Sequence, residues 1–362
     1  MDSVYRRRGF LPGLDPITRF PADSELAMLD DLGRDLPSLL QETWFRGYAR
    51  QLEIPPWKEA PWGGGDFAML RLYYIRLGFL ASAYINQVGQ PPATVLPCNI
   101  AIPLCRACSL LQRPPILSYD GYALYNWKRF DIDAPIRLGN IETIQNFVHL
   151  YDEHWFILVH VEIEAIAARI LDAVASIQEK LPNPPQGVLD SALTWIATAI
   201  EEQVGVLRRI PEKMDPRIYF KTFRPYIRFF ENVIYQGVER EPINYRGETG
   251  AQSSIMPILV GLLKIPHKSS LLTEHLSAIR YYMPVEHQRL IHSVEQMPSI
   301  RNRADKTIFN RVLEALAIFR EIHYEWAQEY IMRRTTDPRG TGGTPYMRWL
   351  KQLIDETRQW QH

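Results

Sequence analysis

The chain has 362 residues, of which 46% are hydrophobic and 23% are charged, as is usual for soluble globular proteins. Lysine plus arginine and aspartate plus glutamate number 41 each, so no net charge favours nucleic acid or an anionic membrane as a partner. We expect a cytoplasmic protein without signal peptide, membrane span or disulfide framework. The N-terminal charges have no apolar run behind them, long apolar stretches are interrupted by charges, and there are only three cysteines.

Helical periodicity dominates the elements in chain order. Ser24 is an expected N-cap for a leucine-rich helix over 24–42, and a strong helix follows over 66–88. Further helices are predicted over 141–180, 188–210, 271–283 and 305–334, with proline and glycine mainly between them. No convincing run of alternating strands occurs. We predict an all-α fold, with a small helical domain over 1–146 and a larger one over 147–362.

Two of these helices carry a histidine on an apolar face. His323 shares its face with Phe319, Trp326 and Tyr330, and His160 shares its face with Phe156. Such a histidine is most often a core residue with a satisfied hydrogen bond. The alternative is a metal or haem ligand, because a neutral imidazole on a buried face is what iron coordination requires. The pattern alone leaves both interpretations open.

Other motifs point to no chemistry. Cys105 and Cys108 have the spacing of a redox motif, but no βαβ pattern, haem-attachment histidine or second cysteine pair accompanies them, so a packed helix is expected. The "GTGGT" at Gly340–Thr344 follows a helix and lacks the lysine of a P-loop. Generic motifs therefore do not identify the function.

Several segments together resemble the indoleamine 2,3-dioxygenase family. They are "RGFLPGLDP", "PPILSYDGYALYNW", "GAQSSIMPILVGLL", "YYMPVEHQRLI", "RVLEALAIFREIHYEWAQEYI" and "GTGGT", in the order of the family and spread over most of the chain. The resemblance implies haem b in the larger helical domain and dioxygen as co-substrate. It also implies cleavage of the indole C2–C3 bond of L-tryptophan, or of a close indole derivative, to N-formylkynurenine. The expected partner is this small indole molecule; monomer and homo-oligomer both stay open.

The resemblance also implies roles for individual residues. His323 matches the proximal ligand of the haem iron, and Arg320 matches an arginine near a haem propionate, although it could also be an ordinary surface residue. The second ring nitrogen of His323 is expected to donate to a fixed acceptor. Gly250 and Gly342 complete the expected cofactor-binding set.

On the substrate side, Arg224 matches the arginine that holds the tryptophan carboxylate, a task suited to its planar fork of donors. The remaining positions line the pocket or close over it. They are Tyr119 and Phe156 around the indole, Tyr219 and Phe220 beside Arg224, Thr249 and Gly250 in a small-residue segment, and Thr341 in the "GTGGT" loop, near the substrate ammonium and a propionate.

Two positions depart from the animal members of the family. His160 stands where they carry a distal serine and resembles the distal histidine of tryptophan 2,3-dioxygenases, which accepts a hydrogen bond from the indole N–H. Val260 stands where an aspartate is usual, so a pairing of that aspartate with Arg320 is absent. We expect His160 and Arg224 to act in catalysis. Two alternatives stay open: a haem-dependent mono-oxygenase acting on a tryptophan-derived biosynthetic intermediate, and a haem sensor without turnover.

Overall fold

The computed structural model describes residues 1–58, 66–335 and 346–362. Most of this chain is helical, which confirms the predicted all-α class. The helices are α1 (Ser3–Arg8), α2 (Met28–Leu39), α3 (Phe45–Gln51), α4 (Asp66–Ile85), α5 (Cys98–Leu110), α6 (Tyr151–Gln178), α7 (Gln186–Leu207), α8 (Pro216–Ile218), α9 (Ile255–Leu263), α10 (Leu271–Arg280), α11 (Val285–Glu295), α12 (Lys306–Tyr330) and α13 (Tyr346–Gln359). Short helical turns also occur: η1 (Glu25–Ala27), η2 (Asp120–Leu124), η3 (Ile210–Glu212), η4 (Tyr219–Phe223), η5 (Gly250–Gln252) and η6 (Met332–Arg334).

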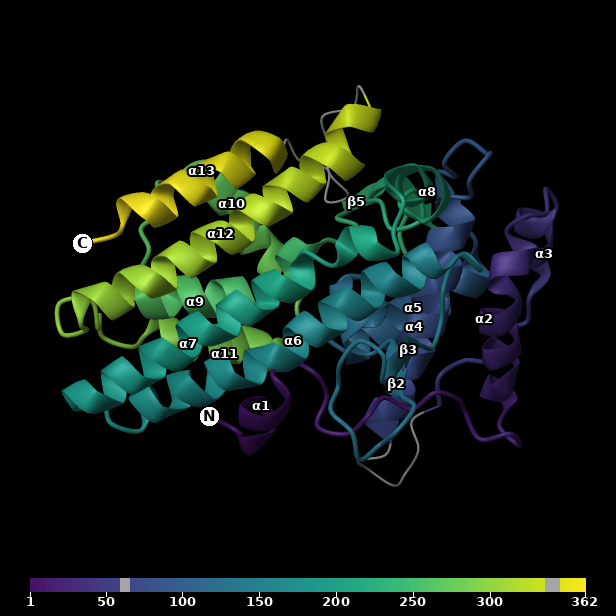
Figure 1. Ribbon diagram of the computed structural model, residues 1–362. Coiled ribbons are helices and arrows are strands. Elements are labelled where there is room, and N and C mark those ends of the chain that lie inside the picture. The colour runs from purple at the N-terminus through teal and green to yellow at the C-terminus, as the bar shows by residue number, and fades with distance from the viewer. Residues whose placement is uncertain (59–65, 336–345) are drawn as a thin grey trace.

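The long helices α6, α7, α12 and α13 pack side by side, whereas α2 and α3 lie at the opposite end of the molecule and α4 lies near them (Figure 1). Helix α7 packs against both α6 and α12, and α13 covers α12. Helix α1 packs against α6, so the first residues of the chain lie with the later helices. The division into domains at residue 146 stays a prediction.

The part of the chain that the structure describes also contains five strands, which were not predicted. β4 (Phe230–Tyr235) lies between β1 (Val95–Leu96), which is parallel to it, and β5 (Ile243–Tyr245), which is antiparallel. β2 (Trp127–Arg129) and β3 (Ile141–Thr143) form an antiparallel pair. Four of these strands have only two or three residues, too short to show an alternating pattern. The longer β4 does not alternate between buried and exposed residues, and its pairing with β5 is irregular between Phe230 and Val233.

Helix α12 is fixed at both ends. The Asp305 carboxylate accepts hydrogen bonds from the backbone N–H groups of Thr307 (2.9 Å) and Ile308 (3.0 Å), which caps the start of the helix. Near the other end, the Trp326 indole N–H donates to the Leu207 carbonyl at 3.1 Å, at the end of α7. This helix carries His323, so these bonds set the position of that side chain.

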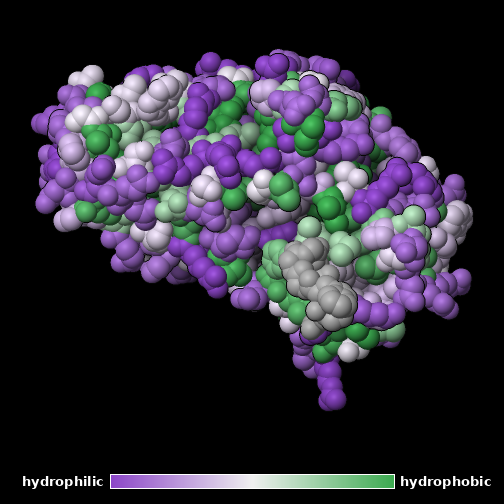
Figure 2. Space-filling view, turned by 90° about the horizontal axis from the view of Figure 1, so that it is seen from below, coloured by the Kyte–Doolittle hydropathy of each residue, from purple (hydrophilic) through white to green (hydrophobic). Residues whose placement is uncertain are grey.

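The outer surface is mixed in character. Seen from below, hydrophilic residues cover most of it, with hydrophobic residues scattered in small groups (Figure 2). Among the described helices, none has the length and the apolar composition needed to cross a membrane.

Candidate functional site

His160 is held in one tautomer by its own helix. Its Nδ1 lies 2.7 Å from the Phe156 carbonyl oxygen, one turn earlier on α6. A carbonyl can only accept, so Nδ1 carries the proton and Nε2 keeps its lone pair. Burial lowers the pKa of His160, which favours the neutral ring. His160 can therefore accept one hydrogen bond at Nε2.

His323 is neutral as well. Burial is the main cause that lowers its pKa to about 4, with a smaller contribution from the charge that His160 would carry. His323 is nonetheless an exposed side chain. The ring is thus accessible and at the same time surrounded mainly by protein, which suits a haem ligand.

Gly250 lies close to the His160 ring. A Cβ atom added to this glycine would come 3.9 Å from His160 Nε2, so any longer side chain would occupy the room in front of that nitrogen. The residues therefore fit a haem: His323 offers a neutral, accessible imidazole that would hold the iron, and Gly250 places no side chain next to His160. No hydrogen bond joins the His323 ring to another described residue, so the expected fixed acceptor is not found among them.

Aromatic rings form a wall next to His160. The Phe156 ring lies 4.6 Å from the His160 ring and 5.5 Å from the Tyr219 ring, measured between centroids. Tyr119 meets His160 edge-on at 5.8 Å. Phe223, which was not among the predicted residues, is fully buried and lies 5.9 Å from Phe156. Such rings suit a flat aromatic ligand.

Arg224 follows the π-helical turn η4, which also carries Tyr219 and Phe220. Its side chain is buried, and its guanidinium carbon lies 5.2 Å from the centre of the Phe220 ring. The Tyr330 hydroxyl on α12 donates to the Met214 carbonyl at 2.8 Å, so the segment before this turn is tied to the helix of His323. π-Helical turns occur frequently at functional sites.

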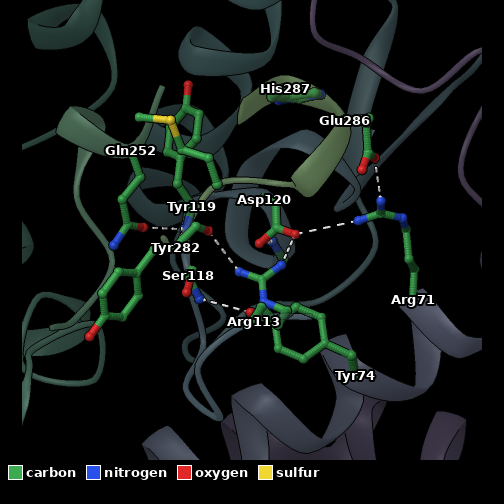
Figure 3. Close-up of polar contacts among 12 residues, drawn as sticks. Arg71, Tyr74, Arg113, Ser118, Tyr119, Asp120, Gln252, Tyr282, Glu286 and His287 are labelled. Carbon is green, nitrogen blue, oxygen red and sulfur yellow. Dashed lines mark hydrogen bonds and ion pairs between the residues drawn. The ribbon is translucent and has the colours of Figure 1, made fainter. Parts of the chain in front are cut away.

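A buried network holds Tyr119 in place (Figure 3). The Tyr119 N–H donates to Gln252 Oε1 at 2.8 Å. The neighbouring Asp120 carboxylate forms a buried ion pair with Arg113 and lies 3.5 Å from Arg71 Nη1 on α4. Helix α4, the Tyr119 turn and the segment of Gln252 are thereby joined behind the site.

Arg320 is buried, and its guanidinium forms hydrogen bonds within the protein. Its Nη1 donates to the Leu353 carbonyl at 2.8 Å and also to the Thr357 hydroxyl, both on α13. Burial lowers its pKa to about 10. Val260 is half-buried on α9. The interpretation of Arg320 as a surface residue is therefore wrong, whereas its role at a propionate stays a prediction.

Thr249 is half-buried, and its hydroxyl caps the turn η5 by accepting from the Ala251 N–H at 3.3 Å. Two predicted residues, Thr341 and Gly342, lie outside the described residues.

A buried glutamate that was not predicted from the sequence lies next to Tyr119. Glu164 lies one turn after His160 on α6 and accepts hydrogen bonds from the hydroxyls of Tyr119 (2.9 Å) and Ser253 (2.6 Å). Burial raises its pKa to about 7, and its Oε2 has no hydrogen-bond partner. The signal was present, because an acidic residue four positions after His160 falls on the same helix face.

A second acidic side chain, Glu248, is 2% exposed and precedes Thr249 directly. Burial raises its pKa to about 8. Its burial could not be predicted, because the residue lies in an irregular segment where no periodicity indicates which side chains are inside.

The two cysteines with redox-motif spacing are structural residues. Cys105 and Cys108 lie on α5, and burial raises the pKa of the Cys105 thiol to about 12 and that of Cys108 further. Both are protonated at neutral pH, so neither is a reactive thiolate. Within the described ranges, no group of three or more His, Cys, Asp or Glu side chains could hold a metal ion by itself.

Comparison with known proteins gives consistent matches. The profile of the family described as Indoleamine 2,3-dioxygenase matches residues 3–339. "Indoleamine 2,3-dioxygenase 1" of Rattus norvegicus is 28% identical, over 91% of this chain and 88% of its own. "Indoleamine 2,3-dioxygenase" of Saccharomyces cerevisiae is 29% identical, over 98% and 91%. A protein named "Myoglobin" from Haliotis madaka is 25% identical, over 91% and 90%.

Proposed function

Because the chain belongs to the indoleamine 2,3-dioxygenase family, we propose that it cleaves the indole C2–C3 bond of L-tryptophan, or of a close indole derivative, to give N-formylkynurenine. It is a haem-dependent dioxygenase, with haem b as cofactor and dioxygen as co-substrate. When bound, the haem supplies the activation of dioxygen. The residues of the chain bind and orient the substrate.

His323 would hold the haem iron. Its neutral, accessible ring supports this role, since iron requires a deprotonated imidazole nitrogen. The hydrogen bonds at both ends of α12 fix the helix that carries the ring. Gly250, which has no side chain, leaves room next to His160.

Arg224 would hold the substrate carboxylate, and the rings of Phe156 and Tyr119 would pack on the indole. A guanidinium can bind a carboxylate through two parallel hydrogen bonds, which fixes the orientation of the amino acid. His160 Nε2 would accept the indole N–H, because that nitrogen has a free lone pair. Orientation and exclusion of water are then the main contributions of the protein.

The observation that carries this proposal is the neutral His160, with Nε2 free, next to the Phe156 and Tyr119 rings. The test is the product mass after the ferrous, haem-loaded protein reacts with L-tryptophan and isotopically labelled dioxygen. Two labelled atoms in N-formylkynurenine are expected.

Two other outcomes would overturn the proposal. One labelled atom in the product would indicate a mono-oxygenase. Tight dioxygen binding without any product would indicate an oxygen-binding or sensing protein, the class suggested by the name of the Haliotis madaka relative.

A further inference from the structure

Glu164 joins two distant segments of the chain through one carboxylate oxygen. Its Oε1 accepts hydrogen bonds from the Tyr119 hydroxyl at 2.9 Å and from the Ser253 hydroxyl at 2.6 Å. The Glu164 side chain is completely buried, and its Oε2 has no hydrogen-bond partner among the described residues. Burying a carboxyl group is costly, and the proposed reaction gives this one no step. Its position therefore needs another explanation.

The same two segments are joined a second time. The Tyr119 N–H donates to Gln252 Oε1 at 2.8 Å, a bond that Figure 3 shows, and Gln252 directly precedes Ser253. Tyr119 is thus held at its backbone by Gln252 and at its hydroxyl by Glu164. The Ser253 N–H donates to the Gly250 carbonyl at 3.0 Å, so the position of Gly250 depends on the same contacts.

Helix α6 provides the fixed reference for these contacts. Glu164 lies one turn after His160, and a helical turn sets the distance between two such residues. The N-terminal segment packs directly on the backbone of α6 at this point, because a Cβ at Gly9 would lie 2.0 Å from the Glu164 carbonyl oxygen. Whatever the Glu164 carboxylate holds is therefore held relative to His160.

Both segments meet the pocket next to His160. The Tyr119 ring meets the His160 ring edge-on at 5.8 Å between centroids, and a Cβ at Gly250 would lie 3.9 Å from His160 Nε2. A tyrosine side chain has several staggered rotamers, and a hydrogen bond at its hydroxyl selects one of them. The bond to Glu164 thus fixes the direction of the ring that faces His160.

We propose that Glu164 is a positioning residue of the substrate pocket. By holding the hydroxyls of Tyr119 and Ser253 on one oxygen, it sets the Tyr119 ring and the segment of Gly250 at fixed distances from His160. It acts as a hydrogen-bond acceptor and does not touch the substrate. The inference rests on the proposed function, in which the Tyr119 ring packs on the indole and His160 accepts the indole N–H.

The experiment compares two substitutions of Glu164. The dissociation constant of L-tryptophan is measured on the ferric, haem-loaded protein through the haem absorption spectrum. Glu164→Leu removes the acceptor and keeps a side chain of similar size, so we expect roughly 10-fold weaker binding. Glu164→Gln keeps an oxygen for both hydroxyls and replaces the oxygen that has no partner, so its affinity should stay within about threefold of the wild type.

A double-mutant cycle tests the contact with Tyr119. Tyr119→Phe removes the donor of the same hydrogen bond and keeps the ring, so it should also weaken L-tryptophan binding roughly 10-fold. Together with Glu164→Leu it should add no more than about a threefold loss, because both substitutions remove one shared contact. Independent effects would multiply to roughly 100-fold.

Tyr122→Phe is the matched control. Tyr122 is also buried, and its hydroxyl donates to a different buried carboxylate, Glu153, at 3.0 Å. This substitution should weaken L-tryptophan binding by less than about twofold, alone or on top of Glu164→Leu. The melting temperatures of the haem-free variants give the general loss of stability, which by itself produces no coupling that is specific to Tyr119.

Two outcomes overturn the inference and leave the proposed function standing. Glu164→Gln could weaken binding as much as Glu164→Leu, which would mean that the charge matters rather than the acceptor. The losses from Glu164→Leu and Tyr119→Phe could also multiply. If Glu164→Leu does not fold, the other two single variants decide: a 10-fold loss in Glu164→Gln, or no loss in Tyr119→Phe, has the same meaning. If the wild type does not bind L-tryptophan, the proposed function fails, and the inference fails with it.

Discussion

At the scale of single residues, burial shifts the charge state of two histidines and two glutamates around the site. The rings of His160 and His323 are kept neutral, and the carboxyl groups of Glu164 and Glu248 are pushed towards their protonated forms. A charged group of a ligand that enters the site is therefore little screened by solvent. Its attraction to an opposite charge on the protein is stronger there than at the surface. This favours ligands that bring both charges, as an amino acid does.

Arg224→Ala should weaken L-tryptophan binding roughly 10- to 150-fold, because a charge-assisted hydrogen bond to the carboxylate contributes about 1.5–3 kcal/mol. The dissociation constants of L-tryptophan and of haem, both followed in the haem absorption spectrum, check this. Haem affinity should stay within about threefold of the wild type. Arg217→Ala removes an exposed arginine from the same segment and serves as the control. Equal loss of haem and tryptophan binding would contradict the assignment of Arg224.

Glu164→Gln should flatten the pH dependence of stability. The pKa of Glu164 is about 7 in the folded protein against an ordinary value of 4.5, so between these values only the unfolded chain ionises. The free energy of unfolding of the wild type therefore falls as pH rises through this window, by up to about 1.4 kcal/mol per pH unit from this group. Gln keeps the acceptor for Tyr119 and Ser253, which limits other damage.

The measurement for Glu164 is urea unfolding of both proteins at pH 5 and pH 7.5. The free energy of unfolding lost between the two pH values should be smaller in Glu164→Gln by about 2.4 kcal/mol. The ionisation of other buried groups, Glu153 among them, is common to both proteins and cancels in this comparison. If both proteins lose the same free energy of unfolding between pH 5 and pH 7.5, Glu164 is already ionised in the folded state.

At the scale of elements, the sequence predicts the helices well but predicts only part of the site. The apolar periodicity predicts the helix of His323 over 305–334, and it is observed at Lys306–Tyr330. Both histidines lie on the expected helices because a helix face fixes side-chain direction. Glu248 and Gln252 could not be found in this way. Their segment is irregular, and contacts with residues distant in sequence decide its path.

The contact between α12 and α13 runs through Arg320 and Thr357. Arg320→Ala and Thr357→Val should each loosen α13, because the buried guanidinium loses its partners on that helix or the partner loses its hydroxyl. We expect the amide protons of α13 to exchange roughly 10-fold faster in both variants, as measured by hydrogen–deuterium exchange. Arg348→Ala, at an exposed position of α13, is the control.

The pair of variants also tests the haem-propionate prediction for Arg320. If Arg320 contacts the haem as well as α13, Arg320→Ala should release haem faster than Thr357→Val does, because Thr357 holds only the helix. Equal rates of haem transfer to an acceptor protein would leave Arg320 as a residue that only anchors α13.

At the scale of the whole molecule, the site joins segments that are far apart in the chain. His160 comes from α6, His323 from α12, Gly250 from η5, and Tyr119 from the turn before η2. A ligand that contacts all of them stabilises their mutual arrangement, and it can do so only in the folded state. Haem binding should therefore raise the free energy of unfolding of the whole protein.

Loading with haem should raise the free energy of unfolding by about 2.7 kcal/mol when free haem is at 100 times its dissociation constant. The melting temperatures of the haem-free and haem-loaded proteins check this. In His323→Ala the increase should largely disappear, because the ring that would hold the iron is gone, while the melting temperature of the haem-free variant should stay near that of the haem-free wild type. The His323 ring has no hydrogen bond to the described residues, so its removal costs the haem-free fold little. A variant that keeps the full increase and a normal five-coordinate ferrous spectrum would show that another residue holds the iron.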